Sequence, residues 1–259
     1  MKLLNNRKNK YNPKSMNFGI IAAGEGSRLV DEGVAYPKPL VPLCGEPMIG
    51  RLIRIFRESG AQRISLIVNE QMTEVREFAE RLKRELPIEI DITVKTTPSS
   101  MHSFYEVGKS LHGHGRFIVT TVDTIFREPD FAKYVKAYAD APEDVDGMMA
   151  VTTFVDDEKP LYVATSPEMR IVRFLDEPVG EFARNAGIKQ YVSGGIYGLG
   201  DKAVDLLDSC LRDGVSRMRN YQRALVGAGL RLKAFDMGKI IDVDHAGDIR
   251  KAEEFIREA

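Results

Sequence analysis

The chain of 259 residues has a formal net charge of −1, with 43% hydrophobic and 29% charged residues. This composition is typical of a globular protein, and the near-neutral charge gives no electrostatic basis for binding nucleic acid or an anionic membrane. No apolar run reaches the roughly 20 residues of a membrane helix, and residues 1–15 lack the apolar core of a signal peptide. We therefore expect a cytoplasmic protein without nucleic-acid or membrane partners.

The length suits one large α/β domain, which we place at residues 16–259, after a disordered extension over residues 1–15. Met16 is an alternative start of the chain. The two cysteines, Cys44 and Cys210, are far apart and lack metal-binding spacing, so we expect buried free thiols in a reducing compartment. A homo-oligomer remains open, because one sequence does not reveal a subunit interface.

The first predicted element is a buried strand over residues 18–21, and a loop of small residues follows it. Glycine lets a ligand approach the backbone closely, and the N–H groups of such a loop can bind phosphate oxygens. The cation Arg28 ends the loop, and Lys38 follows ten residues later between two prolines. The candidate nucleotide-binding residues of the loop are Ala22, Ala23, Gly24, Glu25, Gly26 and Ser27.

This loop is neither of two common phosphate-binding motifs. No Gly-Lys-Ser/Thr follows Gly26, which excludes a Walker A motif, and the third glycine of the dinucleotide fingerprint is missing. Two fixed cations beside a backbone anion site suit a polyphosphate, which makes Arg28 and Lys38 candidate catalytic residues. The alternative is an ordinary turn between a strand and a loop.

Helices and strands alternate after this loop. Apolar residues at helical spacing predict a helix over 48–59, and the β-branched run at 64–68 is typical of a parallel strand. A helix over 71–85 and a strand over 88–94 continue the pattern. This alternation predicts a three-layer α/β fold with a doubly wound, mostly parallel mixed sheet.

A polar segment over 96–103 then opens into a helix that ends near residue 111. Ser99 and Ser100 fit helix capping, and His102 fits a solvated helix start. Asp123 comes just after the next buried strand, at 116–121, and the carboxyl ends of such strands are where open α/β sheets bind ligands. A turn or cap residue is the alternative for Asp123.

The remaining elements are helices at 131–138, 201–211, 216–226 and 246–258, and strands at 147–154, 162–165, 171–175, 190–199, 230–235 and 240–244. We interpret the two helices between 201 and 226 as cover for the sheet. Gly194 and Gly195 either let a ligand approach the backbone or mark a β-bulge. Asp242 and Asp244 alternate on the last strand and so face the same way, with helix capping as the alternative for Asp244.

Three motifs together resemble the signature of the nucleotidyltransferases that activate sugar 1-phosphates. They are Ala-Ala-Gly-Glu-Gly-Ser-Arg-Leu at 22–29, Pro-Lys-Pro-Leu at 37–40 and Gly-Glu-Pro-Met-Ile at 45–49. The resemblance is to a short form without the β-helix domain that some members append. It implies a Rossmann-like, GT-A-like fold and the transfer of a nucleoside monophosphate from an NTP to a phosphorylated acceptor, with release of pyrophosphate.

The resemblance also implies roles for the charged candidates. Arg28 would steady the β- and γ-phosphates, and Lys38 the α-phosphate. Asp123, with Asp242 or Asp244, would hold Mg²⁺, a cation that prefers carboxylate oxygens. Residues 99–103 correspond to the family's base-binding loop. Its candidate nucleotide contacts in this chain are Ser99, Ser100 and Ser103.

The acceptor side departs from the family pattern. Members often have Phe-x-Glu-Lys-Pro, whose lysine meets the acceptor's phosphate, whereas this chain has Phe-Leu-Asp-Glu-Pro at 174–178. Glu177 therefore reverses the charge, which indicates an unusual acceptor or a phosphate held from elsewhere, for example by Arg173. The candidate acceptor-binding residues are Gly195, Asp176 and Lys189.

Three functions follow from these observations. The first is a Mg²⁺-dependent transferase that moves NMP from an NTP to a sugar 1-phosphate. The second is a cytidylyltransferase that acts on an alcohol phosphate such as phosphocholine or inositol phosphate, which the altered base loop and Glu177 favour. The third is a regulatory protein that binds nucleotides without turnover, although the retained cations and carboxylates argue against it.

Overall fold

The computed structural model describes residues 16–155 and 159–258, so the predicted extension over residues 1–15 lies outside the described part of the chain. The strands of the main sheet are β1 (Met16–Ala22), β4 (Ala61–Val68), β5 (Glu89–Val94), β6 (Phe117–Thr121), β8 (Gly147–Thr152), β9 (Tyr162–Thr165), β10 (Ile171–Leu175), β11 (Lys189–Leu199) and β12 (Leu232–Asp236). Two short ladders pair β2 (Pro42–Leu43) with β3 (Glu46–Pro47), and β7 (Thr124–Ile125) with β13 (Ile241–Asp242).

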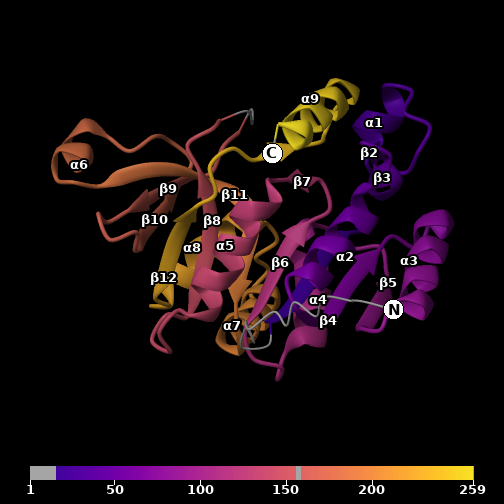
Figure 1. The fold of residues 1–259 in the computed structure, drawn as a ribbon. Coiled ribbons are helices and arrows are strands. Elements are labelled where there is room, and N and C mark those ends of the chain that lie inside the picture. The colour runs from indigo at the N-terminus through magenta and orange to yellow at the C-terminus, as the bar shows by residue number, and fades with distance from the viewer. Residues whose placement is uncertain (1–15, 156–158, 259) are drawn as a thin grey trace, which may run out of the picture.

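The main sheet has nine strands and mixed direction. Its order is β10-β9-β11-β6-β1-β4-β5, and β8 and β12 extend it beside β11 (Figure 1). β6, β1, β4 and β5 are mutually parallel, whereas β11 is antiparallel to β6, β8 and β9. The parallel strands place their carboxyl ends at one edge, where the loop after β1 and Asp123 after β6 lie.

Helices cover both faces of this sheet. They are α1 (Ser27–Asp31), α2 (Met48–Glu58), α3 (Thr73–Glu85), α4 (Ser100–Leu111), α5 (Glu128–Ala139), α6 (Glu181–Asn185), α7 (Asp201–Arg212), α8 (Met218–Gly227) and α9 (Ala246–Arg257), with the 3₁₀ turn η1 (Lys38–Leu40). One apolar core joins β1 to α2, α3, α5 and α9, and a second lies under α4, α7 and α8. The predicted three-layer α/β fold is confirmed. Within the described residues, no helix is long and apolar enough to cross a membrane.

The central strand β1 serves both cores because its side chains alternate. Phe18 and Ile20 pack in the first core, and Ile21 packs in the second. Phe18 stacks on Phe56 of α2 at 4.5 Å between ring centroids. On the other face, a Cβ at Gly19 would lie 2.4 Å from Cγ1 of Val107, so the glycine lets α4 pack directly on the strand.

The main helices and strands follow the predictions, and the differences concern short elements. The predicted strand over 240–244 is reduced to Ile241–Asp242, so Asp244 lies beyond its end. The short elements that were not predicted are α1, η1, β2, β3, β7 and α6. Cys44 and Cys210 are both free, as expected, but the prediction that both are buried is wrong for Cys44. Cys44 is exposed because it forms the tight turn between β2 and β3, where its φ is 51°.

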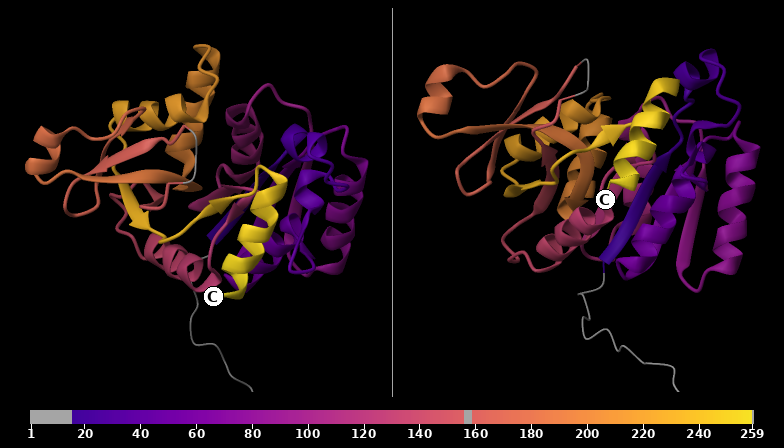
Figure 2. Two further views of the ribbon diagram at one scale, coloured as in Figure 1. Left: turned by 90° about the horizontal axis from the view of Figure 1, so that it is seen from above. Right: turned by 45° about the horizontal axis from the view of Figure 1, so that its top comes forward.

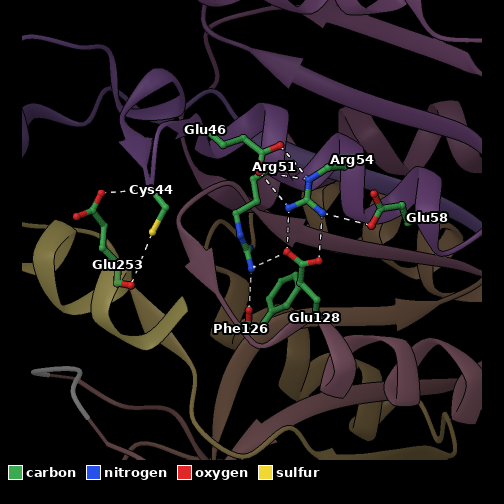
Figure 3. Close-up of polar contacts among 8 residues, drawn as sticks. All are labelled: Cys44, Glu46, Arg51, Arg54, Glu58, Phe126, Glu128 and Glu253. Carbon is green, nitrogen blue, oxygen red and sulfur yellow. Dashed lines mark hydrogen bonds and ion pairs between the residues drawn. The ribbon is translucent and has the colours of Figure 1, made fainter. Parts of the chain in front are cut away.

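A network of charged side chains fixes α2 to its neighbours. Arg54 binds Glu46 of β3 and Glu128 of α5, at 3.0 and 2.8 Å, and Arg51 donates to the carbonyl of Phe126 (Figure 3). The hydrogen bonds from Arg54 lower the pKa of Glu128, because they favour the charged carboxylate. The network therefore holds the β2–β3 hairpin, which follows η1, at a fixed place beside α5.

The C-terminal helix α9 packs against the N-terminal part of the chain. The N–H of Cys44 donates to Oε1 of Glu253 on α9 at 2.8 Å (Figure 3). At the other end of α9, a carboxylate oxygen of Glu32 accepts from the N–H of Ala246 at 2.6 Å. In two orientations the C-terminal helix runs beside the N-terminal segment around β2 (Figures 1 and 2). This packing brings residues 242–248 next to the loop after β1.

Asn69, at the end of β4, connects three loops at the same edge. Its side-chain amide donates to the carbonyl of Ala23 at 3.1 Å, and its Oδ1 accepts from the N–H of Gln71 and the hydroxyl of Thr96. The side chain is buried, so no water replaces these partners readily. The hydrogen bond from Asn69 to Ala23 therefore helps to fix the small-residue loop after β1.

We expect Asn69→Ala to lower the free energy of unfolding by about 1–3 kcal/mol, because it leaves buried polar groups unpaired. Urea unfolding of the two proteins would measure the difference. Glu70→Ala, which removes the exposed neighbouring side chain, serves as control and should change stability by less than about 0.5 kcal/mol. Equal effects of the two substitutions would contradict this role of Asn69.

Candidate active site

The loop after β1 leaves its backbone open at the sheet edge. Ala22 and Ala23 are buried, whereas Gly24, Glu25 and Ser27 are exposed. Gly26 has a φ of 64°, and a Cβ there would lie 2.7 Å from Cβ of Lys38. Both its conformation and its contact with η1 therefore require glycine.

Lys38 makes the central polar contacts of the site. Its Nζ lies 2.5 Å from a carboxylate oxygen of Asp123 and 2.7 Å from one of Asp244, and only 11% of its side chain is exposed. Burial opposes the charge of this lysine, but the two carboxylates outweigh burial and raise its pKa. Lys38 is therefore held as an ammonium ion. Arg28 lies on the other side of Asp244, at 3.3 Å, and is mostly exposed.

A short ladder brings the predicted metal-binding aspartates together. Asp242 of β13 pairs with Thr124 of β7, and the N–H of Val243 donates to the carbonyl of Asp123 at 3.1 Å. Burial, and then the charges of Asp123 and Asp244, raise the pKa of Asp242 to about 7. The region thus carries more negative charge than the ammonium of Lys38 balances.

The carboxylates suit a hard divalent cation only in part. In the described ranges, no three histidine, cysteine, aspartate or glutamate side chains converge closely enough to bind a metal ion by themselves. Mg²⁺ commonly takes one or two carboxylates and completes its shell with water and phosphate oxygens. The oxygen donors of Asp123 and Asp242 fit that requirement.

Two cavities of about 430 and 390 Å³ open beside these residues. Arg28, Gly194 and His245 line the first cavity. The second is lined by Asp123 and by Ser99, Ser100 and Gly195 of the predicted base-binding and acceptor-binding segments. Arg217, for which no binding role was predicted, also lines it. The residues shared by both are Lys159, Ser193, Arg219, Asp242 and Asp244.

The predicted base-binding segment reaches across to α8. Ser99 donates its hydroxyl to the carbonyl of Ser216 at 2.6 Å and lies 2.8 Å from Nδ1 of His102. Ser99 occupies the N-cap position of α4 but makes no side-chain cap. Ser103 is buried and pairs with Thr97, so it does not line either cavity. Ser99 and Ser100 are thus the two predicted serines that face the second cavity.

Gly194 and Gly195 form a β-bulge in β11 that also faces the cavities. The pairing register with β8 shifts between Ser193 and Tyr197, and Gly195 has a φ of 72°. A Cβ at Gly194 would lie 2.4 Å from Cδ1 of Ile240. The bulge that the sequence offered as one interpretation is therefore present, and Gly194 lines the first cavity and Gly195 the second.

The other predicted acceptor-binding residues lie outside both cavities. Asp176 is bound to two arginines of α8, Arg219 and Arg223, and Lys189 is an exposed residue at the start of β11. The interpretation of the helix near residues 216–226 as cover alone is wrong, because Arg217 and Arg219 line a cavity. The sequence contained one signal of this: Arg217 and Arg219 lie at the start of a helix, where the helix dipole disfavours cations.

The sequence of this chain matches a known protein family over most of its length. A family model described as nucleotidyl transferase matches residues 19–255. A mannose-1-phosphate guanyltransferase of Schizosaccharomyces pombe is 28% identical over 195 residues, which cover 73% of this chain and 51% of the relative. The chain thus spans about half the length of the curated mannose-1-phosphate guanyltransferases that it matches.

Solved structures of the same fold have matching lengths. A Bacillus anthracis protein described as a candidate glucose-1-phosphate thymidylyltransferase superposes with a TM-score of 0.76 at 18% identity, covering 95% of this chain and 96% of that one. The inositol-1-phosphate CTP transferase of T. maritima superposes with a TM-score of 0.72 at 18% identity, covering 93% and 98%. The fold and the family model agree with the three sequence motifs, so this chain belongs to the nucleotidyl transferase family.

Proposed function

We propose that this protein transfers a nucleoside monophosphate from an NTP to a sugar 1-phosphate and releases pyrophosphate. The observation that carries the proposal is the meeting of Lys38, Asp123 and Asp244, from three distant parts of the chain, beside the glycine loop. Cations and carboxylates that line two cavities with shared wall residues suit a reaction between two phosphorylated substrates.

The reaction needs positioning and charge neutralisation more than proton transfer. A phosphate oxygen of the acceptor forms a new bond to the α-phosphorus of the NTP, and the bond from that phosphorus to the bridging oxygen breaks. Pyrophosphate leaves with the electron pair. The exposed loop backbone from Gly24 to Ser27 would bind NTP phosphates, and Arg28 the departing β- and γ-phosphates.

Lys38 would stabilise the α-phosphate as negative charge develops. Asp123 and Asp244 keep its side chain charged and oriented before substrate arrives. Asp123 and Asp242 would hold Mg²⁺, which supplies additional positive charge to the phosphates when bound. Lys38 and its aspartates therefore act as a preorganised electrostatic site.

A second candidate function is a cytidylyltransferase for an alcohol phosphate. Glu177 in place of a phosphate-binding lysine favours it, and the T. maritima inositol-1-phosphate CTP transferase shares the fold. A regulatory nucleotide-binding protein is the third, and the intact set of Arg28, Lys38, Asp123 and Asp242 argues against it.

Pyrophosphate release with Mg²⁺, each of the four NTPs and a panel of sugar and alcohol phosphates tests these functions. We expect release that requires one NTP together with a sugar 1-phosphate. Dependence on CTP and an alcohol phosphate would favour the second function instead. Tight NTP binding without release for any acceptor would favour the regulatory protein.

We expect Lys38→Ala to lower kcat by about 10²–10³-fold, because it removes a charge aimed at the transition state. NTP binding, measured by calorimetry, should weaken far less, since the loop and Arg28 remain. Lys133→Ala on α5, which removes a surface lysine paired with Asp130, is the control. Near-normal turnover of Lys38→Ala would exclude this assignment.

Substitution of each C-terminal aspartate should identify the second metal ligand. We expect Asp242→Asn to raise the Mg²⁺ concentration for half-maximal activity by about 10-fold or more, on the scale of metal-site perturbations. Asp244→Asn should lower kcat with little change in that concentration, because Asp244 contacts Lys38 and Arg28. The reverse pattern would assign the metal to Asp244.

A further inference from the structure

Two arginines stand at the start of α8 without an explanation in the reaction above. Arg217 is the N-cap residue of this helix and Arg219 lies in its first turn, which contains no acidic residue. The N-terminus of a helix carries partial positive charge, so cations there are disfavoured. Their presence at the wall of a cavity indicates an anionic ligand that offsets this cost.

Arg219 is held rigidly and still has donors to spare. Its NH1 lies 2.5 Å from a carboxylate oxygen of Asp176, and its NH2 donates to the carbonyl of Lys159 at 3.0 Å. A guanidinium has five N–H donors, so these contacts leave others for a ligand. Arg219 lines both cavities, as Asp242 and Asp244 do.

Asp176 orients this arginine from outside the cavities. One of its oxygens binds Arg219, and the other binds NH2 of Arg223 at 2.6 Å. Hydrogen bonds from Arg223 and Arg219 lower the pKa of Asp176, so the carboxylate stays charged. Arg223 is itself anchored, since its Nε donates to the carbonyl of Phe174 at 3.3 Å.

The helix that carries these arginines is fixed to the sheet. The buried Gln222 accepts a hydrogen bond from the hydroxyl of Ser193 on β11 at 3.1 Å, and Tyr221 donates to the carbonyl of Ala203 on α7 at 2.7 Å. The guanidinium groups are therefore presented by a packed helix, beside the glycine bulge of β11.

The charges at this wall leave a positive surplus. Asp176 supplies one negative charge to two arginines, and Arg217 has no side-chain ion pair or hydrogen bond within the described residues. Asp123 and Asp242 also line the second cavity. A dianionic phosphate in this cavity would be attracted to the arginines and repelled by the carboxylates.

We propose that Arg219 and Arg217 bind the phosphate of the acceptor, with Asp176 as the positioning residue for Arg219. The proposal rests on the transferase function proposed above and assigns its acceptor side. In-line displacement requires the attacking phosphate to approach opposite the leaving pyrophosphate. Arg28, assigned to the leaving pyrophosphate, lines only the first cavity. Arg217, assigned to the attacking phosphate, lines only the second.

The first test compares Arg219→Gln with the wild type in steady-state kinetics. We expect the KM for the acceptor to rise by about 10- to 100-fold, the cost of losing charge-assisted hydrogen bonds, and the KM for the NTP to change less than about 2-fold. Arg212→Gln on α7, whose partner is Asp208, removes an arginine outside the cavities and should change neither. An unchanged acceptor KM, or an equal rise for the NTP, would overturn the proposal.

The same comparison of the KM for the acceptor with the KM for the NTP tests Asp176 as a positioning residue. Asp176→Asn should raise the acceptor KM by less than Arg219→Gln does, with kcat little changed, and Asp176→Glu should restore part of the loss. Melting temperatures of both variants separate this effect from unfolding. Loss of kcat alone, or no rescue by glutamate, would contradict the positioning role.

Binding of inorganic phosphate separates this inference from the proposed function. By calorimetry, Arg219→Gln and Arg217→Gln should weaken phosphate binding about 10-fold or more, and Arg212→Gln should not. This comparison needs no turnover, so it decides the inference even if no NTP and acceptor pair releases pyrophosphate. Phosphate binding that is equal in the wild type and both cavity variants would overturn the assignment.

Discussion

A lysine placed between two aspartates is the interaction on which the site depends. Lys38 contacts Asp123, from the middle of the chain, and Asp244, from its end. With Asp242 nearby, three carboxylates share one small region, and such charges repel unless a cation lies among them. Burial and this repulsion raise the pKa of Asp242 to about 7. The folded chain therefore needs positive charge at this point, and Lys38 supplies it.

This constraint explains the polar contacts around residues 242–248. A carboxylate of Glu32 binds the ring of His245 and the N–H of Ala246, both at 2.6 Å. Asp248 accepts the N–H of His245 at 2.9 Å and so fixes the first turn of α9. Exposed contacts of this kind contribute little singly, but together they hold the C-terminal segment against β1's loop despite the repulsion between carboxylates.

The sequence was sufficient for features of the site that neighbouring residues form. The strand, the glycine loop and Lys38 lie within one short stretch, and Asp123 follows its strand directly, so local patterns predicted them. Periodicity placed the main helices and strands and the three-layer fold. It did not predict that the last strand stops at Asp242, because the turn into α9 is set by contacts with Glu32, more than 200 residues away in sequence.

The acceptor side shows a second limit of prediction from the sequence. The effect of each charged side chain there depends on the partner that it contacts in the folded chain. Read alone, Asp176 and Glu177 suggest that positive charge has been lost where a phosphate should bind. In the folded chain Asp176 contacts Arg219, 43 residues later, and thereby orients a cation at the cavity wall. Proteins of this fold are named for different nucleotides and acceptors, so the sheet alone does not select the acceptor. Under the arrangement proposed here, the cations that bind the acceptor's phosphate lie at the start of α8 and not in the segment after β10. Asp176 of that segment positions one of them, Arg219.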